Sequence, residues 1–231
     1  MIKKMSCKYY STILVAFFVL TGFTLSAASM NFNNPPLSFI DQKQLEKKVD
    51  AYVKPYLQTG DFSGSILIAK SGDVLLMKSY GLADRENKIL NTPQTKFHLA
   101  STSKPFTTAA IMLLEEQGRL KVTDPLTKFI PGYPNGDKIT VHHLMIHSTG
   151  IANINGFSNY GSLSQHSQTP ATLVAQFKNK ALIFEPGDRY SYSNSNYNLL
   201  AYIIEHVSGK DYGTFLKENI FDPHRYEKLR S

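Results

Sequence analysis

The chain has 231 residues, one cysteine, 42% hydrophobic residues and a formal net charge of +7. This length is enough for one domain with a substantial core, and a single cysteine excludes a small protein held together by disulfides. Basic residues alternate with acidic ones, as in Lys43, Glu46, Lys47, Lys48 and Asp50, so no basic stripe predicts a nucleic-acid partner.

Residues 1–28 have the composition of a secretory signal peptide. Lys3, Lys4 and Lys8 precede an apolar stretch at residues 13–25, and Ala28 ends a run of small residues suited to cleavage. The stretch is short for a membrane span, so an uncleaved anchor is the alternative. We therefore expect export to a bacterial periplasm or the exterior, with no stable membrane span after cleavage.

The segment that follows predicts a flexible lead, a helix and a β-hairpin. Residues 29–37 are rich in Asn and Pro, and we expect the domain to occupy residues 38–223. The apolar residues from Leu45 to Leu57 recur at helical spacing. Residues 65–70 and 74–80 are apolar and strand-like, and the Ser-Gly-Asp run between them predicts a hairpin turn.

Ser101 and Lys104 form a Ser-x-x-Lys motif at the predicted start of the next helix. Pro105 fits only in a first helical turn, where its missing N–H is not needed, so Ser101 must lie at or near the helix end. A serine hydroxyl needs a nearby proton acceptor to act as a nucleophile, and an amine three residues along a helix lies on the same face. The motif is short enough to occur by chance, and Gly118 is expected to end the helix.

The remaining chain is predicted to be mostly helical. Thr140 is positioned to cap a helix at 141–146, and Thr169 to cap one ending near residue 179. A helix from residue 194 or 195 to Ser208 should stop at Gly209, before a last one at 212–220. The predicted order is one helix, two strands and then many helices, without alternating strand–helix units. This order predicts an α+β fold.

Tyr192 and Asn194 form a second motif, Tyr-x-Asn, just before a predicted helix. A phenol titrates near 10, but a neighbouring ammonium favours the phenolate, so Tyr192 is a candidate general base. The Asn194 amide offers a donor and an acceptor to a substrate amide. A second Tyr-x-Asn copy begins at Tyr133, in a Pro- and Gly-rich loop, where we expect only a turn.

Several longer segments resemble the serine β-lactamase-related family, which comprises class C β-lactamases, penicillin-binding DD-carboxypeptidases and esterase relatives. They occur in the family's order and cover most of residues 40–223: 97–107, 116–126, 144–150, 184–200 and 221–223. The resemblance implies a β-lactamase/DD-peptidase-like α+β fold, an antiparallel sheet flanked by helices with a helical subdomain. It implies Ser101 as the nucleophile, Lys104 and Tyr192 as catalytic partners, Asn194 as a substrate-amide contact, and no cofactor. Which of Lys104 and Tyr192 takes the proton stays open.

The sequence departs from the family after the second motif. The family's third motif, Lys-Thr-Gly or a His-x-Gly variant, lies on a strand beyond the tyrosine, whereas the Lys-Ser-Gly at residues 70–72 precedes Ser101 and should be only the hairpin turn. Residues 224–231 diverge from the family pattern. We therefore expect a truncated member without the C-terminal sheet strands, and a weak or inactive catalyst, because one of its two oxyanion-hole donors would be missing.

Two readings of the function follow. The first is an exported serine hydrolase that forms an acyl-enzyme with D-Ala-D-Ala peptides, β-lactams, or small esters and amides. The second is a non-catalytic remnant that binds such ligands without turnover. A metal site at His142, His143 and His147 is the weaker interpretation of those histidines, since zinc needs a further ligand and an open position, and we expect a structural role for them and no metal. The substrate and the oligomeric state cannot be read from the sequence.

Overall fold

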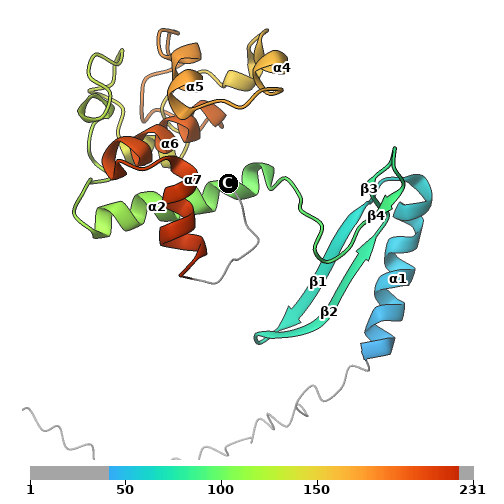
Figure 1. The fold of residues 1–231 in the computed structure, drawn as a ribbon. Helices are drawn as coiled ribbons and strands as arrows, with labels where there is room; N and C mark the ends of the chain where they lie inside the picture. The colour runs from blue at the N-terminus through green and yellow to red at the C-terminus, as the bar shows by residue number, and fades with distance from the viewer. Residues whose placement is uncertain (1–41, 224–231) are drawn as a thin grey trace, which may run out of the picture. The chain divides into compact units, whose positions relative to one another are not determined.

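The computed structural model describes residues 42–223, which fall into two compact units, with described ranges 42–96 and 97–223 (Figure 1). The described strands all lie in the first unit, and the elements of the second unit are helices. The order of helix, hairpin and helices agrees with the α+β prediction. The predicted signal peptide, lead and divergent tail lie outside the described residues, and the predicted domain limits stay predictions. Within residues 42–223, no helix is both long and apolar enough to cross a membrane.

The first unit is a helix packed beside a hairpin. Helix α1 (Gln42–Thr59) contacts strand β2 (Asp73–Tyr80), which pairs antiparallel with β1 (Gly64–Lys70). The two-residue turn has positive φ at Ser71 (52°) and Gly72 (91°), the combination that matches the twist of a tight hairpin. The hairpin turn predicted for residues 71–73 is therefore confirmed. A second small pair, β3 (Leu82–Asp84) with β4 (Ile89–Leu90), was not predicted.

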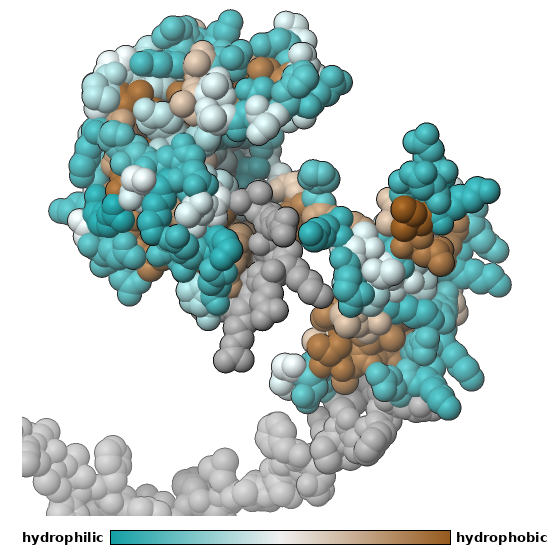
Figure 2. All heavy atoms as spheres, viewed as in Figure 1, coloured by the Kyte–Doolittle hydropathy of each residue, from teal (hydrophilic) through white to brown (hydrophobic). Residues whose placement is uncertain are grey.

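The two faces of this hairpin differ. On the face toward α1, Lys78 Nζ contacts Glu46 and Asp50 at 2.6 and 2.8 Å, and Tyr80 OH donates a hydrogen bond to Asp50 at 2.8 Å. On the other face, Leu67 and Met77 are register partners and, with Val74, are more than half exposed (58%, 53% and 56%). Figure 2 shows hydrophobic surface over the hairpin in this view.

The second unit is built around helix α6 (Asn194–Ser208), which contacts α2 (Lys104–Glu116), α3 (Val141–Met145), α5 (Pro170–Phe177) and α7 (Tyr212–Leu216). The shorter elements are the 3-10 helices η1 (Ala100–Ser103), η2 (Leu126–Lys128) and η3 (Ile154–Gly156), helix α4 (Tyr160–Leu163), and the π-helical turn η4 (Lys217–Phe221) that continues α7.

Local sequence signals explain where these helices begin and end. The Thr140 and Thr169 side chains accept hydrogen bonds from the third residues of α3 and α5, and each forms a capping box. Gly209, at φ 72°, ends α6 in the left-handed conformation that glycine adopts without strain. The predicted starts at Thr140, Thr169 and Asn194 are confirmed.

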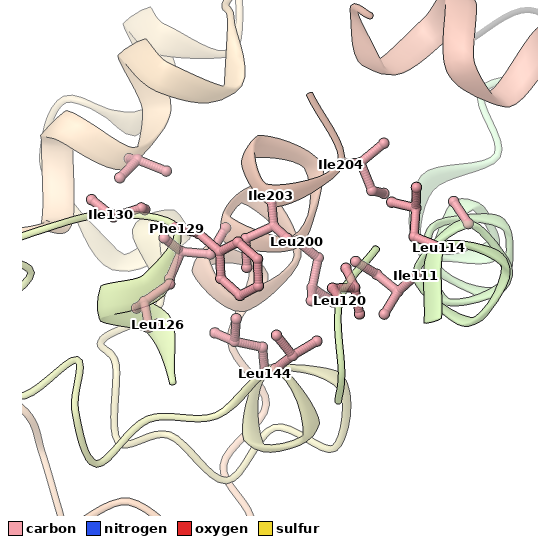
Figure 3. Packing of buried hydrophobic residues seen from close by; sticks show 14 of the residues in the cluster. Ile111, Leu114, Leu120, Leu126, Phe129, Ile130, Leu144, Leu200, Ile203 and Ile204 are labelled. Atoms are coloured by element: carbon pink, nitrogen blue, oxygen red, sulfur yellow. The ribbon is translucent and has the colours of Figure 1, made fainter. Parts of the chain in front are cut away.

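Buried aliphatic residues from several elements form one continuous core in the second unit. Figure 3 shows Ile204 of α6 beside Leu114 of α2, and Leu200 beside Leu120. These four side chains are no more than 2% exposed. On α2, Ile111 is fully buried while Ala109 is exposed.

Candidate active site

Ser101 and Lys104 lie at the junction of η1 and α2. Ser101 is in the 3-10 turn, Lys104 begins the α-helix, and Pro105 occupies its first turn, as predicted. The Lys104 Nζ atom donates a hydrogen bond to Ser101 Oγ at 3.3 Å. Ala100, immediately before Ser101, has a φ of 47°. This value lies in the left-handed region, which few residues other than glycine and asparagine adopt.

Tyr192 and Asn194 approach these two residues from the turn that leads into α6. The Tyr192 hydroxyl lies 2.7 Å from Ser101 Oγ. The Asn194 Oδ1 atom accepts hydrogen bonds from Lys104 Nζ at 2.7 Å and from Tyr192 OH at 3.1 Å. The structure therefore brings all four sequence-predicted site residues into one hydrogen-bonded cluster, although Tyr192 is 91 residues from Ser101 in the chain.

Asn194 makes more contacts within the protein than the sequence predicted. Its Nδ2 donates to Asn155 Oδ1 at 2.7 Å, and its backbone N–H donates to Asn153 Oδ1 at 3.1 Å. An amide oxygen has two lone pairs and an amide nitrogen two hydrogens, so these hydrogen bonds occupy both lone pairs and one hydrogen. The second Nδ2 hydrogen is the group that can reach a ligand.

The electrostatic environment makes Tyr192 more acidic than an ordinary tyrosine. Burial acts to raise the pKa of its phenol, but hydrogen bonds with Lys104 and Ser101 and the positive charge of Lys104 act in the other direction and prevail. The pKa of Tyr192 therefore lies below its usual value near 10. The Lys104 ammonium also lies 5.0 Å from the centre of the Tyr192 ring and 5.3 Å from that of Tyr197.

A cavity of about 630 Å³ opens beside this cluster, entirely within the second unit. Its wall includes Ala100, Ser101, Lys104, Asn155, Tyr160, Leu163, His166, Gln168, Asn194 and Tyr197. None of the residues that line it is acidic. The volume lies in the range of small-molecule binding sites.

Sequence reasoning missed Asn153 and Asn155, which hold Asn194 from the loop around η3 (Ile154–Gly156). The loop at 151–168 carries no pattern in the sequence that would assign a partner to these amides. Tyr197 also lines the cavity and lies one helical turn after Asn194, a spacing that could have identified it.

The remaining sequence candidates occupy other places. The Tyr133 copy of the second motif lies in a turn, with Asn135 at φ 55° and Tyr133 buried, and Lys70 ends β1 at the hairpin turn. His143 takes part in the capping box of α3, and His147 is buried beside Tyr192. Among residues 42–223, no group of three His, Cys, Asp or Glu side chains is placed to hold a metal.

Comparisons with known proteins agree with the resemblance seen in the sequence. The Beta-lactamase family model matches residues 49–227. The Bacillus subtilis (strain 168) protein PbpX, which is named as a penicillin-binding protein, is 37% identical over 172 residues, covering 74% of this chain and 42% of PbpX. This chain thus spans less than half the length of that relative.

Two solved structures share the fold. The penicillin binding protein from Bacillus halodurans aligns with a TM-score of 0.65 at 28% identity, covering 74% of this chain and 53% of that one. The D-amino acid amidase from Ochrobactrum anthropi SV3 aligns with a TM-score of 0.69 at 26% identity, covering 77% and 49%. The predicted fold type is confirmed, and the chain belongs to the β-lactamase family, whose members are serine hydrolases.

Proposed function

We propose that residues 97–223 carry the nucleophile and proton-transfer groups of an exported serine hydrolase. The observation that supports this most directly is the position of Ser101 Oγ, which lies 2.7 Å from Tyr192 OH and 3.3 Å from Lys104 Nζ. Nucleophilic catalysis requires a serine within hydrogen-bonding distance of a proton acceptor, and a third group that orients this acceptor.

In the proposed reaction, the Tyr192 phenolate takes the proton of Ser101 as Oγ attacks the substrate carbonyl. The bond between the carbonyl carbon and the leaving group then breaks, the leaving group takes the proton back from Tyr192, and an acyl ester remains on Ser101. Water then hydrolyses the ester. Tyr192 takes a proton from the water and returns it to Ser101 Oγ as the ester bond breaks. Tyr192 is the better placed base because it is the closer of the two groups to Oγ and its pKa is lowered.

Lys104 has a supporting role in this scheme. Its Nζ donates to Ser101 Oγ and to Asn194 Oδ1, and its charge favours the phenolate of Tyr192. The free hydrogen of Asn194 Nδ2 would donate to a carbonyl oxygen of the substrate, a narrower role than the two-way amide contact expected from the sequence.

The proposed substrates are D-Ala-D-Ala peptides, β-lactams, and small esters or amides. The names of similar proteins support this range, since they include penicillin-binding proteins and a D-amino acid amidase. The predicted signal peptide at residues 1–28 supports a periplasmic or secreted location, where peptidoglycan peptides would be met. The rival reading is binding of such ligands without turnover.

Covalent labelling with a fluorescent penicillin tests the proposal. We expect the wild-type chain to be labelled, Ser101→Ala to lose all label, and the control Ser103→Ala, two residues along the same 3-10 turn, to keep it. Equal labelling of Ser101→Ala and wild type would contradict the assignment of the nucleophile. A folded wild-type chain that takes no label would favour the rival reading of binding without turnover.

A further inference from the structure

His147 lies beside the proposed base but is absent from the proposed chemistry. It follows α3 (Val141–Met145) and is only 8% exposed. Its φ of 60° lies in the left-handed region, which histidine adopts more readily than most residues. Its ring centre lies 4.6 Å from that of Tyr192 and 5.2 Å from that of Tyr197.

This one residue holds the backbone on both sides of Tyr192. The backbone N–H of Ser191 donates to the His147 carbonyl oxygen at 2.8 Å. The backbone N–H of Ser193 donates to the ring Nδ1 of His147 at 3.3 Å. Because the residues before and after Tyr192 are both fixed to His147, the direction in which the phenol leaves the backbone is fixed as well.

A buried chain of hydrogen bonds sets the role of the His147 ring. Thr149 Oγ1 donates to Asn196 Oδ1 at 2.7 Å, and Asn196 Nδ2 lies 3.3 Å from His147 Nδ1. With its oxygen engaged by Thr149, the Asn196 amide presents its NH₂ group to the ring. Nδ1 therefore faces two donors, Asn196 Nδ2 and the Ser193 N–H, and must be an acceptor, which leaves the ring proton on Nε2.

The charges around the ring favour this neutral form. Burial lowers the pKa of His147, and the positive charge of Lys104 lowers it further. The other groups against the ring are the phenols of Tyr190, Tyr192 and Tyr197 and the amide of Asn196. A protonated ring would lose its acceptor and put a second positive charge near Lys104.

We propose that His147 is a positioning residue for acyl transfer, which holds the Tyr192 turn through its Nδ1 acceptor and carbonyl oxygen so that the phenol meets Ser101. Thr149 and Asn196 act behind it by keeping the acceptor directed at Ser193. This inference rests on the proposed function of Ser101 and Tyr192. It predicts that loss of the Nδ1 acceptor alone slows acylation.

The test compares His147→Asn with His147→Gly in the full chain. Both residues tolerate a φ of 60°, but only asparagine offers an oxygen near the position of Nδ1. We expect His147→Gly to slow labelling by a fluorescent penicillin about 10- to 100-fold, as displacement of a reacting group by about 1 Å does. His147→Asn should recover most of that loss. The exposed His142, changed to Asn and to Gly, is the matched control and should leave the rate unchanged.

Amide hydrogen exchange in the same samples supplies a readout that needs no activity. In His147→Gly the Ser193 amide should exchange faster, while the Ser191 amide, bonded to a backbone oxygen, should keep its protection; His147→Asn should protect both. Thr149→Val is the alternative variant if His147→Gly does not fold, because it leaves the His147 ring in place. It too should slow labelling and accelerate exchange of the Ser193 amide.

The outcomes separate the two proposals. Equal labelling rates for the Asn and Gly variants, or faster exchange at Ser193 without slower labelling, would overturn the positioning role of His147. A folded wild type that takes no label would refute the proposed function instead, and protection at Ser193 lost in His147→Gly and regained in His147→Asn would then decide whether the turn is held as inferred.

Discussion

The two units of the chain differ in how their apolar residues are used. In residues 97–223, side chains from α2, α3, α5, α6 and α7 form one continuous buried core. In residues 42–96, the buried apolar residues are Val53, Leu76 and Tyr80, while Leu67, Val74 and Met77 are mostly exposed. Burial of apolar area is the main source of folding free energy, so the second unit has by far the larger share of it.

The candidate site follows the same division. Ser101, Lys104, Tyr192 and Asn194 all belong to the second unit, and Lys104 and Asn194 begin α2 and α6, two helices that contribute to its core. We infer that the chemistry depends on the packing around α6 within the second unit. Three predictions test this separation.

The largest effect should come from the proposed base. Tyr192→Phe removes the group that receives the Ser101 proton, and we expect labelling by a fluorescent penicillin to slow by about 10²- to 10⁴-fold, the usual contribution of a general base. In the wild type the rate should rise with pH as the phenol of Tyr192 loses its proton, with a midpoint below 10, because its folded-state pKa is lowered.

Tyr190→Phe is the control, because that side chain is 69% exposed and is not part of the hydrogen-bonded cluster around Ser101. Its labelling rate should match the wild type within error. An unchanged rate in Tyr192→Phe, with the pH profile also unchanged, would transfer the role of base to Lys104.

The next effect concerns stability. Leu200→Ala leaves a cavity at a fully buried position of α6 and should lower the free energy of unfolding by about 2–5 kcal/mol. Leu67→Ala, at a position that is 58% exposed, should change it by no more than about 0.5 kcal/mol. Urea denaturation followed by circular dichroism measures both. A cost at Leu67 similar to that at Leu200 would show that the open face of the hairpin is covered in solution.

The smallest effect should be an acid sensitivity confined to the first unit. Hydrogen bonds from Lys78 and Tyr80 lower the pKa of Asp50 in the folded protein. Their contribution to stability is therefore complete above the unfolded-state value of about 3.9 and is lost as the pH falls through the lower folded-state value. Hydrogen exchange of the β2 amides, corrected for intrinsic rates, should accelerate below about pH 4.

The matched variants for this effect are Asp50→Asn and Asp73→Asn. The first removes the titrating carboxylate and should make β2 exchange independent of pH in this range. The second, at the exposed hairpin turn, should keep the wild-type profile. Acid sensitivity that persists in Asp50→Asn would place its origin in another carboxylate.

Local signals in the sequence predicted the main helices and the hairpin, because caps such as Thr140 and Thr169 and turn residues such as Gly72 act over a few residues. The Ser101, Lys104, Tyr192 and Asn194 assignments came from motifs and from family resemblance, and the structure brings these residues together. Asn155 and the acceptor role of His147 were not predictable, because hydrogen bonds between residues 39 and 46 positions apart leave no local pattern. The exposure of Leu67, Val74 and Met77 was also not predictable, since an apolar strand pattern does not reveal whether a face is covered.

The backbone at Ala100 has a consequence for anyone who engineers this protein. A left-handed alanine costs about 1–2 kcal/mol relative to glycine, so replacement by glycine is the kind of change a stabilisation screen would select. Yet Ala100 precedes Ser101 in the chain and lines the cavity. Backbone strain at such positions often helps to hold the catalytic residues in place. A glycine at residue 100 would raise stability but loosen the orientation of Ser101. Stabilising substitutions are therefore better sought on the exposed face of the hairpin than in the turn that carries Ser101.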